Sequence, residues 1–325
     1  MSHDEQGDQA FLKPENRGRW PEMTYGGALS FMRRRYTRDL SGVDVAVSGI
    51  PYDGAVTYRP GARLGPRAIR AAAVQMAELK AFPYGFDPFD TLSVVDYGDC
   101  FLDPHHPETI VATIEFHIAS ILAAGAIPLS LGGDHFVTYP ILRAIAKAHG
   151  AVSLLHFDAH CDTWDDDGKR FDHGSMFLRA ANEGLIDPAR SCQIGIRTHN
   201  DTDHGFEILT APWIHRHGID ATVAAIRERI GDGRVYLTFD IDCLDPAFAP
   251  GTGTPVAGGL SSAQALGILH GLQGLEIVGA DVVEVAPAYD HAEITAIAGA
   301  TIAHDIICLL AANRGATENP VGRLR

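Results

Sequence analysis

Two segments of this sequence place metal-ligand side chains at alternating positions directly after a run of apolar residues. They are Asp158-Ala159-His160-Cys161-Asp162 and, further along, Asp240-Ile241-Asp242-Cys243-Leu244-Asp245. In an extended segment, residues i, i+2 and i+4 point the same way, so the ligands of each segment can converge on one point. A third apolar run ends in Gly132-Gly133-Asp134-His135 and adds another candidate imidazole. The three segments together predict a metal site.

The predicted ligands are two imidazoles and four carboxylates: His135, Asp158, His160, Asp162, Asp240 and Asp242. Like charges about 4 Å apart cost several kcal/mol at a protein-like dielectric, so this group requires cations. A hard, oxygen-rich set suits Mn²⁺ better than it suits Zn²⁺. Because one ion rarely takes six protein ligands and still admits water and substrate, we expect two bridged ions and hydrolytic chemistry. A single D-x-H or D-x-D segment is usually a turn, a cap or an ion pair, and only the combination favours metal.

Apolar runs that alternate with helical spacing predict the elements that must position these ligands. We predict strands over 43–50, 92–95, 127–131, 152–157, 192–196, 235–239 and 277–283, and helices over 66–76, 108–124, 138–148, 221–230, 262–272 and 292–313. Pro66 suits a first helical turn, and Ser261 or Ser262 suits an N-cap. The alternation predicts a three-layer α/β/α fold with a mostly parallel central sheet. Each ligand motif follows a predicted strand, where parallel sheets bind ligands.

Composition indicates a globular protein with one large core. The chain has 325 residues, of which 46% are hydrophobic, and we expect one catalytic domain over 23–325 after a polar N-terminal surface arm over 1–22. The arm has the pattern of neither a signal peptide nor a membrane anchor. Five scattered cysteines without C-x-x-C spacing fit a reducing cytoplasm rather than a disulfide framework. The net charge of -15 argues against nucleic acid and is compatible with a cationic substrate, although acidity also serves solubility.

Two loops rich in glycine and proline, 59–66 and 250–255, were candidates for phosphate binding. Neither contains the Gly-Lys-Ser/Thr ending of a P-loop, and no G-x-G-x-x-G follows the first predicted strand. We therefore expect rigid loops around an active-site rim and no nucleotide cofactor.

The three ligand motifs resemble the signatures of the ureohydrolase family that contains the arginases and agmatinases. Three more segments, 171–177, 249–255 and 283–291, are most similar to bacterial agmatinases in that family. The resemblance covers most of the chain and is weaker over residues 1–32. It implies an arginase-like fold and a homo-oligomer, either a trimer or a hexamer.

The resemblance also implies how the ligands divide between two Mn²⁺ ions. One ion would be held by His135, Asp158, Asp162 and Asp240, and the other by Asp158, His160, Asp240 and Asp242. Asp158 and Asp240 would bridge. A water shared by the two ions would lose a proton near neutral pH and attack a guanidinium carbon as hydroxide.

Three catalytic roles follow from the same resemblance. Glu284 would hold the guanidinium fork through two parallel N–H bonds. His173 would bind substrate and move a proton to the leaving amine. Asp162 would orient the nucleophile through its free oxygen. The alternative for Glu284 is an ordinary ion pair, and without the resemblance a histidine in a polar loop such as His173 is more often solvent-exposed or part of a local turn.

The expected reaction is agmatine + water → putrescine + urea. Arginases usually carry Asn two residues after D-A-H-x-D, whereas this chain has Trp164, which disfavours arginine. Residues 165–172 carry four acids against two bases, which favours a distal ammonium on the substrate, although a solvated surface loop is equally compatible. The alternatives are hydrolysis of guanidinobutyrate or guanidinopropionate, a single-zinc amide deacetylase, and a non-catalytic metal-binding paralogue.

Overall fold

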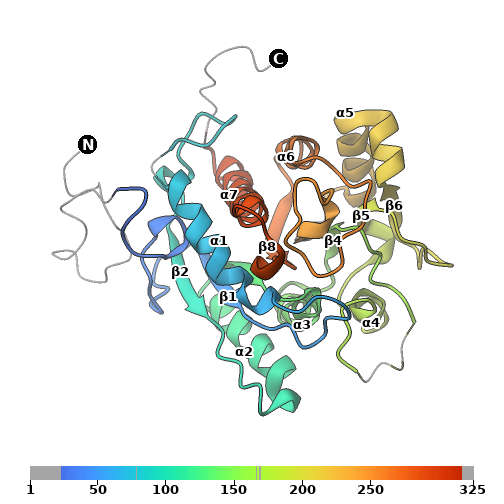
Figure 1. Ribbon diagram of the computed structural model, residues 1–325, viewed down its shortest axis with the longest axis horizontal. Coiled ribbons are helices and arrows are strands. Elements are labelled where there is room, and N and C mark those ends of the chain that lie inside the picture. Colours follow the sequence, from blue (N-terminus) through green and yellow to red (C-terminus); the bar gives the residue numbers. More distant parts are fainter. Residues whose placement is uncertain (1–22, 78, 166, 168–169, 317–325) are drawn as a thin grey trace.

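The computed structural model describes residues 23–77, 79–165, 167 and 170–316 (Figure 1). Within them, eight strands form one sheet in the order β2-β1-β3-β8-β7-β4-β5-β6, and every neighbouring pair is parallel. The strands are β1 (Val45–Ile50), β2 (Val94–Asp99), β3 (Ile127–Gly132), β4 (Ser153–Phe157), β5 (Cys192–Ile196), β6 (Glu207–Thr210), β7 (Arg234–Asp240) and β8 (Glu276–Val283). The predicted arm over 1–22 lies outside the described residues.

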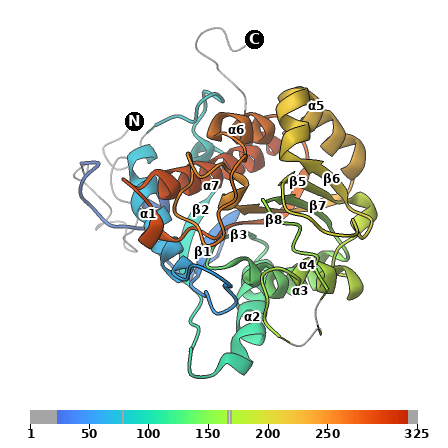
Figure 2. The ribbon, with the colours of Figure 1, turned by 45° about the vertical axis from the view of Figure 1, so that its right-hand side comes forward.

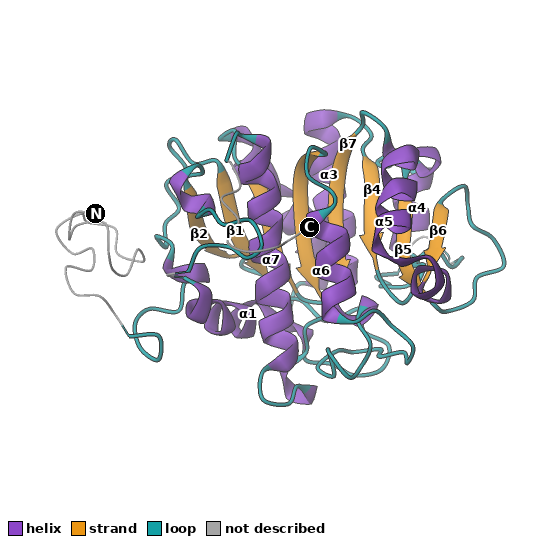
Figure 3. Ribbon diagram, turned by 90° about the horizontal axis from the view of Figure 1, so that it is seen from above, coloured by secondary structure: helices purple, strands orange, loops and turns teal. Residues whose placement is uncertain are grey.

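Helices cover both faces of the sheet. They are α1 (Gly65–Ala73), α2 (Ile110–Ala123), α3 (Thr138–His149), α4 (Met176–Asn182), α5 (Ala211–Ile230), α6 (Ser262–His270) and α7 (Ile294–Asn313). One core cluster joins the sheet to α1, α5, α6 and α7, and the other joins it to α2, α3 and α4. Figures 2 and 3 show the resulting three layers. The predicted α/β/α architecture with a parallel sheet is confirmed.

Local signals in the sequence account for several helix starts. Pro66 lies in the first turn of α1, where its missing N–H is not needed. Ser261 is the N-cap of α6 and forms a capping box with Gln264, so each side chain satisfies the other's free backbone N–H. Both positions match the prediction.

Two elements were not predicted, and one began earlier than expected. The strand β6 is a short, half-buried strand at the sheet edge, and α4 has only 7 residues, so neither carries a strong periodic pattern. The helix α5 starts at Ala211, whereas the prediction began at residue 221. Its two parts meet at Gly218, whose φ of 83° interrupts the helical geometry. That interruption also breaks the apolar spacing on which the prediction depended.

The longest apolar helix belongs to the core. Among the described helices, α7 alone is long and apolar enough to cross a membrane, yet 78% of its most apolar window is buried inside the protein. It packs against α1 and α6 and lies over the sheet. Burial against protein accounts for its apolar composition.

Candidate metal centre

The four strands at the middle of the sheet bring the predicted ligands together. Along the sheet these strands are β3, β8, β7 and β4, and their carboxyl ends lead directly into His135, Glu284, Asp240 and Asp158. Because the strands are parallel, residues far apart in sequence leave the sheet at the same edge. The convergence expected of the three motifs is therefore a consequence of strand order.

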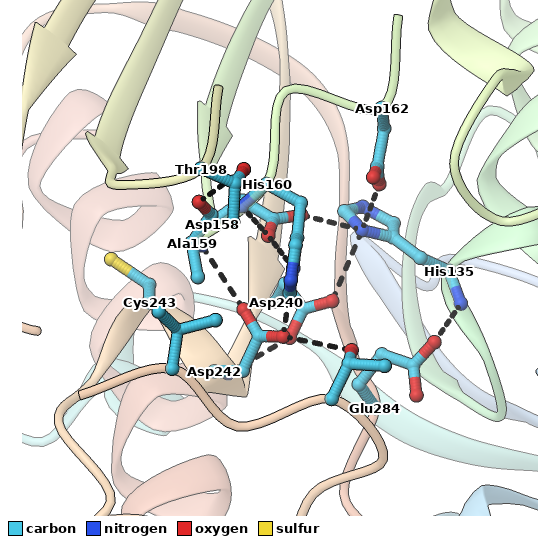
Figure 4. A network of polar contacts seen from close by, with 12 residues as sticks. His135, Asp158, Ala159, His160, Asp162, Thr198, Asp240, Asp242, Cys243 and Glu284 are labelled. Carbon is cyan, nitrogen blue, oxygen red and sulfur yellow. Dashed lines mark hydrogen bonds and ion pairs between the residues drawn. The ribbon is translucent and has the colours of Figure 1, made fainter. Parts of the chain in front are cut away.

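His135 presents one ring nitrogen to three carboxylates (Figure 4). Its Nδ1 lies 2.9 Å from an oxygen of Asp158, 3.0 Å from one of Asp162 and 3.2 Å from one of Asp240. Its Nε2 lies 2.8 Å from the Thr238 hydroxyl.

The partners of Thr238 fix the tautomer of that ring. The Thr238 hydroxyl donates to Asp281, a buried carboxylate that also accepts hydroxyl groups from Thr138 and Tyr236. With its proton used in this way, the Thr238 oxygen accepts from Nε2–H of His135, and Nδ1 of the neutral ring carries a lone pair. A lone pair that faces three carboxylate oxygens is repulsive unless a cation lies between them.

His160 makes a second group beside the first. Its Nδ1 lies 3.2 Å from Oδ1 of Asp158 and 3.1 Å from Oδ2 of Asp242. Asp158 therefore lies between the two imidazoles, with one oxygen toward each. Asp240 reaches His135 with Oδ2 and accepts the backbone N–H of Asp242 at Oδ1, 2.8 Å away. The group around His135 and the group around His160 therefore share the carboxylate of Asp158.

Burial makes the charged forms of these carboxylates energetically unfavourable. Asp158 is fully buried, and Asp162, Asp240 and Asp242 are at most 4% exposed. Desolvation and the neighbouring carboxylates raise the pKa of Asp240 well above its ordinary value. Burial lowers the pKa of His160, but the charge of Asp242 and the hydrogen bonds to the carboxylates outweigh it and raise the pKa to about 12. Protons and divalent cations compete for the same atoms of this cluster.

These donors fit two cations. Ligand atoms of His135, Asp158 and Asp162 lie within 4.8 Å of one another, and so do those of Asp158, His160 and Asp242. Asp162 stands in a left-handed conformation with φ of 52°, which is strained for a residue other than glycine. Such strain is concentrated at functional sites, where surrounding contacts hold it in place.

Glu284 contacts both His135 and His173. Glu284, with φ of 63°, accepts the backbone N–H of His135 at 2.9 Å and faces Nδ1 of His173 at 3.0 Å, both through Oε1. Its Oε2 is buried and has no hydrogen-bond partner among the described residues. Nε2 of His173 lies 2.9 Å from the Thr57 hydroxyl. A buried carboxylate oxygen with a free lone pair is ready to accept an N–H group.

A cavity of about 340 Å³ opens over the cluster. Its wall includes metal-ligand candidates His135, His160, Asp162 and Asp240, together with Thr57, His173 and Thr254. We call the exposed and partly exposed lining residues Trp164, Asp165, Arg170 and Asp172 the mouth of the cavity. Residues 166, 168 and 169 of the predicted acidic loop lie outside the described residues. The described mouth has two acids and one base, and Arg170 is paired with Asp172 at 3.3 Å.

The sequence motifs did not reveal four polar residues of this centre: Thr57, His156, Thr238 and Asp281. His156 carried a usable signal, since it continues the alternation of 158, 160 and 162 toward the N-terminus. Thr238 likewise precedes Asp240 by two residues. Thr57 reaches His173 across 116 residues, and no local pattern indicates that contact.

Comparison with known proteins gives consistent matches over nearly the whole chain. The sequence model of the arginase family matches residues 43–308. A protein named agmatinase from Chromobacterium violaceum is 61% identical over 306 residues, which are 94% of this chain and 95% of that protein. A crystal structure of a hypothetical agmatinase from Burkholderia thailandensis superposes with a TM-score of 0.92 at 60% identity and covers 94% of this chain and 98% of the other. Proclavaminate amidino hydrolase from Streptomyces clavuligerus gives 0.86 at 41% identity and covers 90% and 100%.

Proposed function

The chain belongs to the arginase family and is an enzyme of the agmatinase type within it, and on that premise we propose that it hydrolyses agmatine to putrescine and urea at a two-manganese centre. The observation that carries the proposal is the pair of ligand groups that share Asp158 beneath an open cavity. A single-ion deacetylase site would not need the second group.

The ligand assignment implied by the family motifs is supported by the distances from His135 to Asp158, Asp162 and Asp240 and from His160 to Asp158 and Asp242. His135, Asp158, Asp162 and Asp240 would hold one ion, and Asp158, His160, Asp240 and Asp242 the other. Bound divalent cations would supply the Lewis acidity that turns water into a nucleophile near neutral pH. Oxygen-rich ligands favour Mn²⁺ over Zn²⁺ for this role.

The protein's own groups would bind and orient the guanidinium. Glu284 offers Oε2, which has no partner in the described residues, and can exchange its contact with His173 for a second N–H of the substrate. His173 would carry the proton that the leaving amine acquires, because its ring lies against Glu284 and on the cavity wall. Asp162 would orient the attacking water, since it faces His135 from the wall of the cavity.

The mouth of the cavity supports agmatine as the substrate. Among the described residues of the mouth, Arg170 is paired with Asp172, which leaves the carboxylate of Asp165, and Trp164 is an aromatic residue of the kind that binds cations. These features suit a distal ammonium. Arg170 is also the observation that favours the second candidate, an acidic guanidino compound such as guanidinobutyrate or guanidinopropionate. The Streptomyces clavuligerus relative is named for yet another substrate, so family membership leaves this choice to the mouth of the cavity.

Substrate competition separates the two candidates. We would compare kcat/KM for urea release from agmatine, guanidinobutyrate, guanidinopropionate and arginine with Mn²⁺-loaded protein. Agmatine should be preferred, and Asp165→Asn should lower kcat/KM for agmatine by about two- to fivefold while raising that for guanidinobutyrate, given the modest strength of exposed ion pairs. Asp232→Asn, which removes an exposed acid away from the cavity, should change neither. Preference for an acidic substrate would reverse the assignment, and no urea from any of them would contradict agmatine hydrolysis and favour the deacetylase or non-catalytic alternatives.

Three further features remain predictions. We expect a single catalytic domain over 23–325, a trimer or hexamer, and a cytoplasmic location with neither membrane nor nucleic acid as partner. Light scattering of the purified protein tests the assembly, and fractionation of cells that express the natural protein tests the location.

A further inference from the structure

We propose that His156 is a positioning residue that holds the carboxylate of Asp158 for the metal ions, and that Gln193 sets the tautomer in which His156 can do so. The inference rests on the proposed metal centre and adds a role for two residues outside its ligand set. Asp158 matters here because it is the carboxylate shared by both ligand groups.

His156 lies in β4, and Asp158 follows directly after the strand, so alternation along the extended chain brings both side chains to the same side. The ring is fully buried. It packs edge-on against His135 and Phe177, with ring centroids 5.1 Å and 4.6 Å apart. Its Nε2 lies 2.7 Å from Oδ2 of Asp158. The aromatic neighbours hold the ring, and the ring reaches the carboxylate.

Gln193 decides which nitrogen of that ring carries the proton. It is the partner of His156 across the β4–β5 pair and is itself fully buried. Its Nε2 lies 2.5 Å from the carbonyl oxygen of Cys161 and 3.2 Å from Nδ1 of His156. A carbonyl only accepts, so the amide must turn its NH₂ group this way. The second amide hydrogen is then donated to Nδ1, which leaves the ring proton on Nε2, facing Asp158.

This arrangement makes His156 a donor and not a metal ligand. Both of its nitrogens are engaged, one accepting from Gln193 and the other donating to Asp158. Each oxygen of Asp158 then has one fixed donor, because Oδ1 accepts the backbone N–H of His160 at 2.6 Å. A carboxylate oxygen can make two such contacts, so one direction at each oxygen stays open for a cation. The carboxylate plane is thereby set before any ion binds.

The affinity for Mn²⁺ tests the inference independently of enzymatic activity. Metal-free wild type and variants would be equilibrated with Mn²⁺ by dialysis, and bound metal per subunit measured against free Mn²⁺. His156→Leu removes the donor and should raise the dissociation constant of at least one ion by about 10- to 100-fold, the usual effect of losing a partner of a metal ligand. His156→Gln can place an amide NH₂ near the same oxygen and should stay within a few-fold of wild type.

Two further variants distinguish a local effect on Mn²⁺ binding from general destabilisation of the fold. Gln193→Met retains the imidazole but frees its tautomer, and should weaken Mn²⁺ binding several-fold. His117→Leu removes another buried histidine, one that contacts Ser48 and no ligand residue, and should leave Mn²⁺ binding unchanged. Thermal unfolding of each metal-free protein would report the stability lost through cavity formation alone.

The outcomes separate the inference from the proposed function. If His156→Leu and Gln193→Met bind Mn²⁺ as tightly as wild type, the positioning role is wrong while the metal centre stands. If His117→Leu weakens binding as much as His156→Leu, the effect is general destabilisation and the role is again wrong. If folded wild type binds no Mn²⁺ at all, the metal centre itself fails.

Discussion

At the scale of single residues, Glu284 is the side chain on which guanidinium binding depends. Replacement by Gln keeps the shape but removes the charge and one of the two acceptor oxygens. Losing one charged partner of a buried, hydrogen-bonded ion pair costs about 2–5 kcal/mol, so Glu284→Gln should lower kcat/KM for agmatine by roughly two to three orders of magnitude. Steady-state kinetics measure the loss. Glu228→Gln, on the exposed face of α5, is the matched control, and a loss below fivefold at Glu284 would contradict the binding role.

The pH dependence of kcat/KM should report the ionisation of His173. Burial lowers the pKa of His173, but the hydrogen bond to Glu284 outweighs it, and the pKa rises to about 9. The charges of Asp162 and Asp134 act in the same direction. Because the protonated ring is the form that donates, activity that depends on it is present below pH 9 and falls as pH rises through that value.

We therefore expect kcat/KM for agmatine, which reports the free enzyme, to decline on the alkaline side, and His173→Asn to abolish that decline and to lower kcat/KM by about 10²- to 10⁴-fold. Glu284→Gln removes the group that raises the pKa and should move the decline to lower pH. Profiles of log(kcat/KM) against pH measure both. An alkaline limb that is identical in wild type and His173→Asn would assign it to another group.

The residues of the site differ in how far sequence could predict them. Asp158, His160 and Asp162 alternate on one short segment, so their convergence is a local property of the chain. Thr57 comes from the loop after β1 and meets His173 only when the sheet has formed. Its role depends on tertiary structure, which no short spacing encodes.

At the scale of elements, the turn after β3 determines where His135 lies. A Cβ atom on Gly133 would fall 1.7 Å from the carbonyl oxygen of Tyr52 and 2.7 Å from its backbone nitrogen. That same oxygen accepts the N–H of Asp134 at 2.7 Å, so the backbone cannot move away without breaking the contact. Only glycine allows the chains after β1 and β3 to pass this closely.

Gly133→Ala should therefore cost more than about 3 kcal/mol of unfolding free energy, among the larger effects of single substitutions. Gly125→Ala is the control: its Cβ would meet nothing within 4 Å, and its φ of 81° should cost only about 1–2 kcal/mol. Chemical denaturation of both variants gives the comparison. Equal losses would show that the close approach to Tyr52 does not constrain the turn.

Elements with long periodic patterns were predictable and short ones were not. The seven predicted strands all exist, with ends at most four residues from those expected, because buried parallel strands are continuous apolar runs. The edge strand β6 has one buried residue in four, so tertiary pairing with β5 defines it more than its own composition does. The start of α5 escaped prediction for a related reason, since Gly218 divides its apolar spacing.

At the scale of the whole molecule, the carboxylates of the centre couple stability to metal. Four of them are buried at the carboxyl ends of the central strands β4 and β7. Ions that bind only the folded state at 1,000 times their dissociation constant stabilise it by about 4 kcal/mol. Removal of metal with a chelator should then lower the melting temperature by about 6 °C for each ion lost, and added Mn²⁺ should restore it.

Differential scanning calorimetry measures this shift. Asp240→Asn removes one carboxylate charge from the cluster. Its melting temperature should rise less on addition of Mn²⁺ than that of wild type. A melting temperature that is the same with and without metal would mean that the cluster holds no ion in the folded protein.

Overall architecture was the most predictable level, since alternation of strands and helices leaves few arrangements other than a covered parallel sheet. The order of strands was not predictable from that alternation. It is this order, with β3, β8, β7 and β4 adjacent, that brings His135, Asp158, Asp240 and Glu284 to one place.

A titration of metal-free protein with Mn²⁺, followed by urea release from agmatine, tests the central claim most directly. We predict no urea without metal and a rise that saturates at two ions per subunit. Full activity without metal, or saturation at one ion, would contradict a two-ion hydrolase.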